Sequence, residues 1–402
     1  MKKLLSSLFV ISALLLSGIY LVGERTENEI QKMFAKSEQQ GVSTELFSYD
    51  KQFLKATVIS QVTLVEGEKP VVFTVTSAIQ HYPHKAVINN QIRLLDPELA
   101  GKAQDYFASE NWISSCEEIS LQGNLTGQLQ LLPGRYSNAQ ELFATKALYL
   151  DYQFDLQDHS GAVNLSWHGL DVWTNYTYFS VESVKFIADF AALPIGSGYD
   201  YFADIAEMVI RQKNTQVQLQ GIELLGSSRF GEQTDTLDSS HEWKVAAYQI
   251  DNDVEKVFTD NSLKLDLKGL YSPALMLLSH SGDDQQQIAK ALTELIAHGG
   301  QLSLTELTSQ TPWGKVYGAL DIMLQQGARL PEIVDNPFML LDYISGNANL
   351  LLPEALLQLP ALSELLQVGL QSGFLKRQKQ ILSLDTQFEQ GELTVNGRVI
   401  PL

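Results

Sequence analysis

Short runs of strand-forming residues, separated by turns rich in Gly, Asn and Asp, recur along most of the chain and constrain its fold more than any other feature. Within residues 117–132 the runs alternate between two faces. Leu121, Leu125 and Leu129 are expected to share one face with Gly123 and Gly127, and Gln122, Gln128 and Gln130 to point the other way. This period of two predicts antiparallel sheet with one solvated face.

Helices are expected between groups of strands. Asp96 and Pro97 are the residue types that cap a helix and begin its first turn. Residues 184–213 are interpreted as two helices broken near Pro194. Residues 285–298 are expected to form an amphipathic helix stopped by Gly299, and 354–372 a very apolar helical pair split at Pro360 and stopped by Gly373. The pattern therefore predicts an α+β fold, predominantly β, with extended antiparallel sheets or meanders, helices packed on one face, and one N-terminal transmembrane helix.

The N-terminus has the pattern of an export signal that stays attached. Lys2 and Lys3 precede an uncharged, mostly apolar run from 4 to 22, close to the roughly 20 residues that cross a bilayer as a helix. Leucine lies at the −3 position of each small residue that could end a signal peptide, which disfavours cleavage. A cleaved signal is the alternative, and either reading exports the body.

These observations predict a domain order. A signal-anchor helix at 1–23 is followed by a polar helical stalk at 24–42 and an exported β-rich body at 43–402. At 402 residues the chain is long enough for one large or two domain-sized units, with a subdivision expected near 190–270. A helix, a glycine stop and two strands occur at 285–325 and again at 355–400, which suggests a degenerate repeat.

Charge and cysteine content exclude some functions. A formal charge of −19 and a pI near 4.7 argue against nucleic acid or an anionic lipid surface as the main partner, because both are polyanions. Cys116 is the single cysteine, so neither an intrachain disulfide nor a zinc site of several cysteines can form.

Residue chemistry predicts no catalytic, cofactor-binding or metal-binding residues. His81 and His84 are three residues apart, but Pro83 places them at a strand end, where a turn with His81 hydrogen-bonded to the backbone is the simpler interpretation. The chain lacks the nucleophile elbow, the P-loop and the dinucleotide-binding glycine motif. We therefore expect no cofactor and a protein that is not an enzyme.

Aromatic residues gather in one stretch. Trp167, Trp173, Tyr176 and Tyr178 are the candidate contacts for a ligand or partner, and cross-strand core pairs are the alternative. The leucine-rich segment 349–370 is expected either in a core or docked on a partner or lipid.

The C-terminal segment carries a family resemblance. Gly373-Phe374-Leu375, Gly391 and the Leu-Thr-Val-Asn-Gly run at 393–397 resemble the end of the YdgA-like family of bacterial proteins, also called DUF945. Softer similarities, among them the Thr-Pro-Trp-Gly turn at 311–314, extend over nearly the whole chain. The resemblance implies an inner-membrane-anchored protein of Gram-negative bacteria that faces the periplasm, and it implies no catalytic residues.

Three functions stay open on these grounds. The first is non-enzymatic binding or scaffolding in the cell envelope by a body tethered to the inner membrane through 4–22 and facing the periplasm. The second is a carrier that holds lipid or another amphiphile in a groove of the sheet. The third is an enzyme of unrecognised type. The expected partner is an unidentified envelope protein or a lipid.

Overall fold

The structure is a computed structural model of the whole chain. It describes residues 2–35, 42–65, 70–191, 198–213, 215–231, 235–250, 257–282, 284–389 and 391–400, with some side chains inside these ranges excepted, residues 2–14 among them. The chain forms two compact units, unit 1 (Met1–Ile187) and unit 2 (Ala188–Leu402), each described here by itself.

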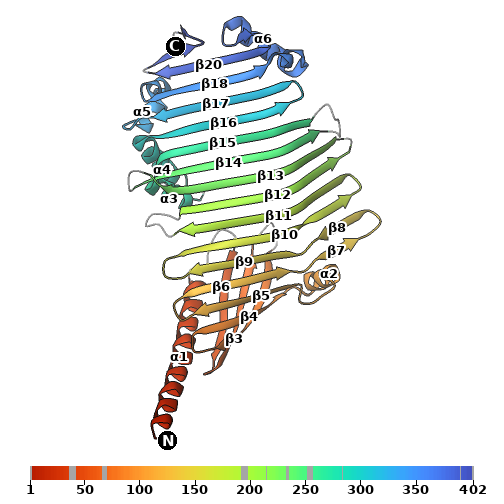
Figure 1. Ribbon diagram of the computed structural model, residues 1–402, viewed down its shortest axis with the longest axis vertical. Helices are drawn as coiled ribbons and strands as arrows, with labels where there is room; N and C mark the ends of the chain where they lie inside the picture. Colours follow the sequence, from red (N-terminus) through yellow and green to blue (C-terminus); the bar gives the residue numbers. More distant parts are fainter. Residues whose placement is uncertain are drawn as a thin grey trace. The chain divides into compact units, whose positions relative to one another are not determined.

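Unit 1 is an antiparallel sheet with a long helix on one face (Figure 1). Its strands pair in the order β1-β2-β3-β4-β5-β6-β9-β10, and β10 also pairs β8, which pairs β7. The elements are α1 (Lys2–Ala35), β1 (Val42–Lys51), β2 (Lys55–Leu64), β3 (Val71–His81), β4 (Lys85–Leu94), α2 (Pro97–Phe107), β5 (Ile113–Ser120), β6 (Asn124–Leu131), β7 (Gly134–Ser137), β8 (Glu141–Thr145), β9 (Leu148–Asp155) and β10 (Ser160–Thr174). Strand β11 (Thr177–Ala191) runs across the division between the units.

The C-terminal half of α1 forms part of the core of unit 1. Val22 and Ile30 are buried against Val58 of β2, Ile79 of β3 and Ile119 of β5. Residues 24–35, expected as the start of a stalk, therefore cover the apolar face of this sheet. Burying these side chains stabilises the unit by about 1.5–3 kcal/mol each.

The predicted membrane span, residues 4–22, lies within α1, but the side chains of 4–14 are outside the described residues. Among the residues that are described, no helix has both the length and the apolar character needed to cross a membrane.

Unit 2 is an antiparallel meander. Its strands pair in the order β12-β13-β14-β15-β16-β17-β18-β20-β21-β22, and β19 pairs the start of β20. The strands are β12 (Gly198–Gln212), β13 (Thr215–Phe230), β14 (Thr236–Ile250), β15 (Val257–Tyr271), β16 (Gly300–Thr311), β17 (Gly314–Leu324), β18 (Ile344–Pro353), β19 (Lys376–Gln378), β20 (Ile381–Glu389), β21 (Glu392–Val395) and β22 (Arg398–Ile400). The helices are α3 (Ser272–His280), α4 (Gln285–His298), α5 (Leu330–Asp335), η2 (Pro337–Asp342), η3 (Glu354–Gln358) and α6 (Pro360–Ser372).

The predominantly β, antiparallel α+β prediction is confirmed, and several of its details hold. The Asp96 carboxylate accepts the backbone N–H groups of Glu98 and Leu99 at 2.8 and 3.2 Å, which caps α2. Gly373 ends α6 in the left-handed conformation. In β6, Leu125, Gly127 and Leu129 share a face as predicted, whereas Leu121 and Gly123 lie in the β5–β6 turn.

One prediction of secondary structure is wrong. Residues 184–213 were expected to form two helices, but the described part of this segment belongs to strands β11 and β12. Its alanines and Met208 favour a helix in isolation. The pairing of β12 with β13 from Tyr199 to Gln212 supplies a full hydrogen-bond ladder that overrides this weak propensity.

Candidate apolar binding face

Three adjacent cross-strand rows of side chains lie on one face of the unit 2 sheet. Directly paired residues of neighbouring strands point to the same face, so the pairing of eight strands defines each row. Read from β12 to β20, the rows are Ala203, Leu224, Trp243, Leu263, Leu307, Gly318, Leu350 and Leu384; Tyr201, Gly226, His241, Leu265, Leu304, Leu320, Ala348 and Thr386; and Tyr199, Ser228, Ser239, Leu267, Leu302, Ile322, Gly346 and Phe388. We call this surface the leucine face.

The opposite face of the same strands is polar. Ser240 donates to the Asp266 carboxylate at 2.5 Å, and Gln301 and Ser303 donate to Asp321 at 2.9 and 3.2 Å. The sheet is therefore amphipathic, with a hydrogen-bonded polar side that suits water and an apolar side that does not.

Helices cover only the margins of the leucine face. Figure 1 shows α3, α4 and α5 at one end of the strands and α6 at the other. Where η3 and α6 pack on the sheet, Leu382 is fully buried, 0% exposed. Leu384 lies two residues further along the same face of β20 and is already partly exposed. Among the described residues, no helix lies across the middle of the face.

The footprint of the leucine face is comparable to that of the largest apolar patch on a soluble monomer. Seven inter-strand spacings of about 4.8 Å give a width of about 34 Å, and three rows two residues apart give about 13 Å along the strands. The product, about 450 Å², is in the range of the largest apolar patches of soluble monomers, which are often functional. The large apolar side chains of the rows are all partly exposed, and Leu302 reaches 36%.

The β12–β14 edge of the leucine face is aromatic. The Tyr201 and His241 ring centroids are 6.2 Å apart, and Trp243 stacks on His241 at 5.9 Å. The Tyr201 hydroxyl and His241 Nδ1 are 3.2 Å apart and share a hydrogen bond. Gly226 lies beneath the Tyr201 ring, where a Cβ would come within 2.1 Å of a ring carbon. These rings offer flat apolar surface with polar atoms at its margin.

A β-bulge in β16 keeps the leucines on one side. Between the first two rows, Leu304 and Leu307 are three residues apart in β16, whereas Gly318 and Leu320 are only two apart in β17. In a regular strand Leu307 would point to the polar face, because it is an odd number of residues from Leu304. The extra residue of the bulge returns Leu307 to the leucine face. Bulges of this kind also bend and twist the strand.

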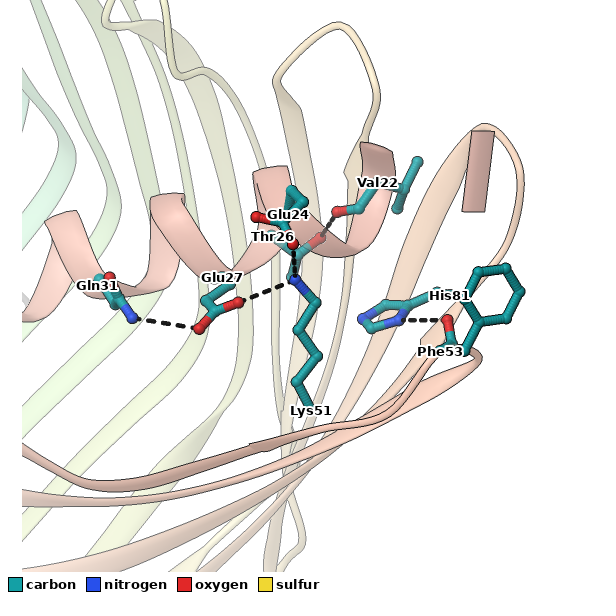
Figure 2. A network of polar contacts seen from close by, with 8 residues as sticks. All are labelled: Val22, Glu24, Thr26, Glu27, Gln31, Lys51, Phe53 and His81. Carbon is teal, nitrogen blue, oxygen red and sulfur yellow. Dashed lines mark hydrogen bonds and ion pairs between the residues drawn. The ribbon is translucent and has the colours of Figure 1, made fainter. Parts of the chain in front are cut away.

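In unit 1, α1 is fixed to the sheet by a polar network (Figure 2). The Lys51 ammonium donates to the carboxylates of Glu24 and Glu27 at 2.5 and 3.0 Å. His81 Nδ1–H donates to the Phe53 carbonyl at 3.4 Å, and the Thr26 hydroxyl donates to the Val22 carbonyl at 2.8 Å.

The charges of this network shift its pKa values. The hydrogen bond from Lys51 lowers the pKa of Glu24. Burial alone would lower the pKa of Lys51, but the hydrogen bonds to Glu24 and Glu27 outweigh burial and raise it. Burial lowers the pKa of His81, whose Nε2 is buried without a hydrogen-bond partner among the described residues. The network favours an ionised Glu24–Lys51 pair beside a neutral imidazole. This arrangement is consistent with a structural role, in which the ion pair attaches α1 to β1.

The other face of the unit 1 sheet carries a hollow of about 520 Å³, lined by both polar and apolar side chains. Its floor contains the paired row Cys116, Gln128, Asp151 and Asn164. Cys116 is exposed, and burial together with nearby Glu117 and Glu118 raises the pKa of its thiol. A thiol held protonated is a poor nucleophile.

The predicted aromatic contacts lie in unit 1, apart from the leucine face. Trp167 is half-buried on β10 and donates to the Thr145 hydroxyl at 3.1 Å. Trp173 on β10 and Tyr176 in the β10–β11 turn are 43% and 74% exposed, and Tyr178 follows at the start of β11. The structure thus spreads the four along one hairpin, and their role as contacts stays a prediction.

The other candidates from the sequence lie at the expected strand end. His81 ends β3 with its ring buried, and His84 is exposed in the β3–β4 turn. Within the part of the chain that is described, no group of three His, Cys, Asp or Glu residues could hold a metal ion.

Sequence reasoning missed the leucine face. Its signal was present as alternating leucines at Leu263, Leu265 and Leu267, and at Leu302 and Leu304. Periodicity identifies which residues share a face of a strand, but whether another layer covers that face depends on tertiary packing.

Comparison with known proteins gives a family and nothing more specific. No curated protein and no solved structure matches the chain. The family model described as "Bacterial protein of unknown function (DUF945)" matches residues 1–402. The chain therefore belongs to the DUF945 family of bacterial proteins.

Proposed function

We propose that this protein is a membrane-tethered, non-enzymatic binding protein of the bacterial cell envelope, and that its ligand is a lipid or another amphiphile held on the leucine face. The observation that carries the proposal is the amphipathic unit 2 sheet, whose apolar rows stay partly exposed across eight strands. An acyl chain laid on this face would remove apolar surface from water, at about 25 cal/mol for each Å² buried.

The tether consists of residues 4–22. Lys2 and Lys3 hold the start of α1 on the cytoplasmic side, and the apolar run crosses the inner membrane into the periplasm. Support comes from the other end of this run, because Val22 is the first core residue of α1 in unit 1. The folded body would therefore begin where the membrane ends.

A second candidate is scaffolding through a protein partner. On α6, Leu362, Leu365 and Val368 follow a three-residue spacing and are 37%, 70% and 57% exposed. An exposed apolar helical stripe suits a protein groove better than an acyl chain. The Leu365→Ser variant would weaken a protein complex and leave lipid binding unchanged.

Photo-crosslinking separates the two candidates. A benzophenone amino acid replaces Leu265 on the leucine face, and the matched control replaces its neighbour Lys264, which points to the polar face. We expect irradiation of intact cells to attach a species of lipid mass to the protein labelled at 265 and not at 264. A protein adduct at 265 would show that the leucine face binds a protein and not a lipid, and no adduct at 265 would refute ligand binding on this face.

The tether is tested separately. A phosphatase fused after residue 402 should be active in the periplasm, and an inactive fusion would refute export. N-terminal sequencing that begins near residue 18 or 24 would show that the segment is a cleaved signal.

A further inference from the structure

Three hairpin tips of unit 1 meet α1 at one level. Gly18 of α1 touches the β3–β4 tip so closely that a Cβ there would come within 2.5 Å of the Pro83 carbonyl oxygen. Arg25 donates to the Leu121 carbonyl of the β5–β6 tip at 2.9 Å. Lys51, at the start of the β1–β2 tip, pairs with Glu24. The tips therefore surround the helix between residues 18 and 25, and the part of α1 before Gly18 projects beyond them (Figure 1).

These tips carry large apolar side chains in place of the usual small polar turn residues. Phe53 and Leu54 of the β1–β2 tip are 49% and 56% exposed, and Tyr82 of the β3–β4 tip is 37% exposed. On the helix at the same level, Tyr20 and Leu21 are 55% and 53% exposed. We call these five residues the rim.

The rim is unusual for a surface that contacts only water. Isolated exposed apolar residues are ordinary, but here two tips and the helix place theirs at one level. Lys55 follows Leu54 directly and is exposed, so a positive charge adjoins the apolar tip in a chain whose net charge is −19. Tyrosines beside aliphatic residues and a lysine are typical of the membrane–water interface.

The level of the rim coincides with the end of the proposed tether. The apolar run of α1 ends at Val22, and the rim side chains lie around its last turns, since Tyr20 and Leu21 belong to the run and the β3–β4 tip contacts Gly18. In a bilayer crossed by this run, residues 18–22 and the rim would lie together at the surface, and the residues before Gly18 would enter the bilayer.

We propose that the rim is a membrane-seating surface: Phe53, Leu54 and Tyr82 insert into the headgroup region of the same bilayer that residues 4–22 cross. The seating rests on the proposed tether. The tether and the β1–β2 and β3–β4 tips would then hold unit 1 against the membrane at three points, and unit 1 would not rotate freely about the helix.

Position-specific fluorescence tests the seating in the full chain. Cysteines replace Leu54 or Leu95 in a Cys116→Ser background and carry an environment-sensitive fluorophore. Leu95 is the matched control, because it is 57% exposed against 56% for Leu54 and lies at the other end of β3, about 30 Å away. A third variant, Leu15→Cys, reports the tether. The protein is reconstituted in vesicles of phosphatidylcholine and phosphatidylglycerol with a quencher attached to the headgroup region.

We expect the label at 54 to shift to shorter wavelength and lose more than half of its emission to the quencher, with the label at 95 unchanged. Equal, unquenched signals at 54 and 95 with a shielded label at 15 would overturn the seating and leave the tether intact. A label at 15 that behaves as in water would overturn both.

Discussion

Both units are antiparallel sheets with one apolar face, but only unit 1 covers that face from within its own chain. In unit 1, α1 lies across the sheet, and Val58, Ile79 and Ile119 are at most 2% exposed. In unit 2, the central leucines stay partly exposed, and among the described residues the fully buried leucine is Leu382, under η3 and α6. The same strand pattern thus yields a closed core in one unit and an open apolar surface in the other.

The difference shows what a single helix contributes. Each aliphatic side chain that α1 buries stabilises unit 1 by about 1.5–3 kcal/mol. The leucines in the open part of unit 2 are only partly buried, so each contributes less. The open face lowers the stability of unit 2 relative to a covered sheet, and a bound amphiphile would restore that stability by mass action.

The largest expected loss of stability comes from a comparison of a covered and an open position on β20. Leu382→Ala should lower the free energy of unfolding by about 2–5 kcal/mol, because it opens a cavity under α6. Leu384→Ala, two residues along the same face, should cost about 1 kcal/mol, since its side chain is already partly solvated. Urea denaturation followed by hydrogen exchange and mass spectrometry, which resolves peptides of each unit, measures both. Equal losses would mean that the leucine face is covered in solution.

A glycine beneath a tyrosine occurs in both units and gives a second comparison. A Cβ at Gly127 would come within 2.2 Å of the Tyr152 ring, and one at Gly226 within 2.1 Å of the Tyr201 ring. Tyr152 packs against the covered core and donates to Glu117 at 3.0 Å, so Gly127→Ala should cost about 1–3 kcal/mol.

The Tyr201 ring can move outward over the open face, so Gly226→Ala should cost less than about 1 kcal/mol. The two variants are compared by thermal unfolding and by exchange protection of β6 and β13. A larger cost at Gly226 would show that the face above Tyr201 is closed.

Acid should weaken unit 1 through His81. Burial lowers the pKa of this imidazole, so the unfolded chain binds a proton more readily than the folded one. The stabilisation is complete above the ordinary histidine pKa of about 6.5 and is lost as the pH falls below it. The urea midpoint, recorded between pH 7.5 and 5, should fall less steeply for His81→Asn than for the wild type. The exposed control, His84→Asn, should keep the wild-type slope.

The smallest effect concerns the ion pairs of α1. Lys51→Met should cost about 1 kcal/mol or less, and the loss should shrink further in high salt, because the Lys51 and Glu27 side chains are 23% and 29% exposed. Lys102→Met, at the open Lys102–Glu98 pair of α2, is the control and should change almost nothing. A loss at Lys51 as large as that of Val22→Ala would mean that charge, rather than apolar packing, holds the helix in place.

Local features were predictable where the decisive interaction is close in sequence. Asp96 caps α2, and Gly373 ends α6, because these contacts involve neighbouring residues. The segment 184–213 was mispredicted because its partner strand β13 and not its own composition determines its conformation. The aromatic edge formed by Tyr199 and Tyr201 was hidden by the same error.

The candidate site was less predictable than the fold. The alternating leucines of β15 could have indicated one face, but the exposure of that face depends on where α3 to α6 pack, which no local pattern encodes. The bulge in β16 also breaks the period of two between Leu304 and Leu307, so a periodicity count separates residues that lie on the same face.

Because of that bulge, the curvature of the leucine face can be changed without changing its leucines. Deleting Thr305 would leave Leu302, Leu304 and Leu307 in strict alternation, all still on the apolar side, while removing the residue that bends β16. The shortened strand would keep every leucine, and it would lose the bend together with the hydrogen bond from Thr305 to Asp266. A natural ligand that requires a curved surface would distinguish the two proteins, whereas a small apolar dye would bind both alike.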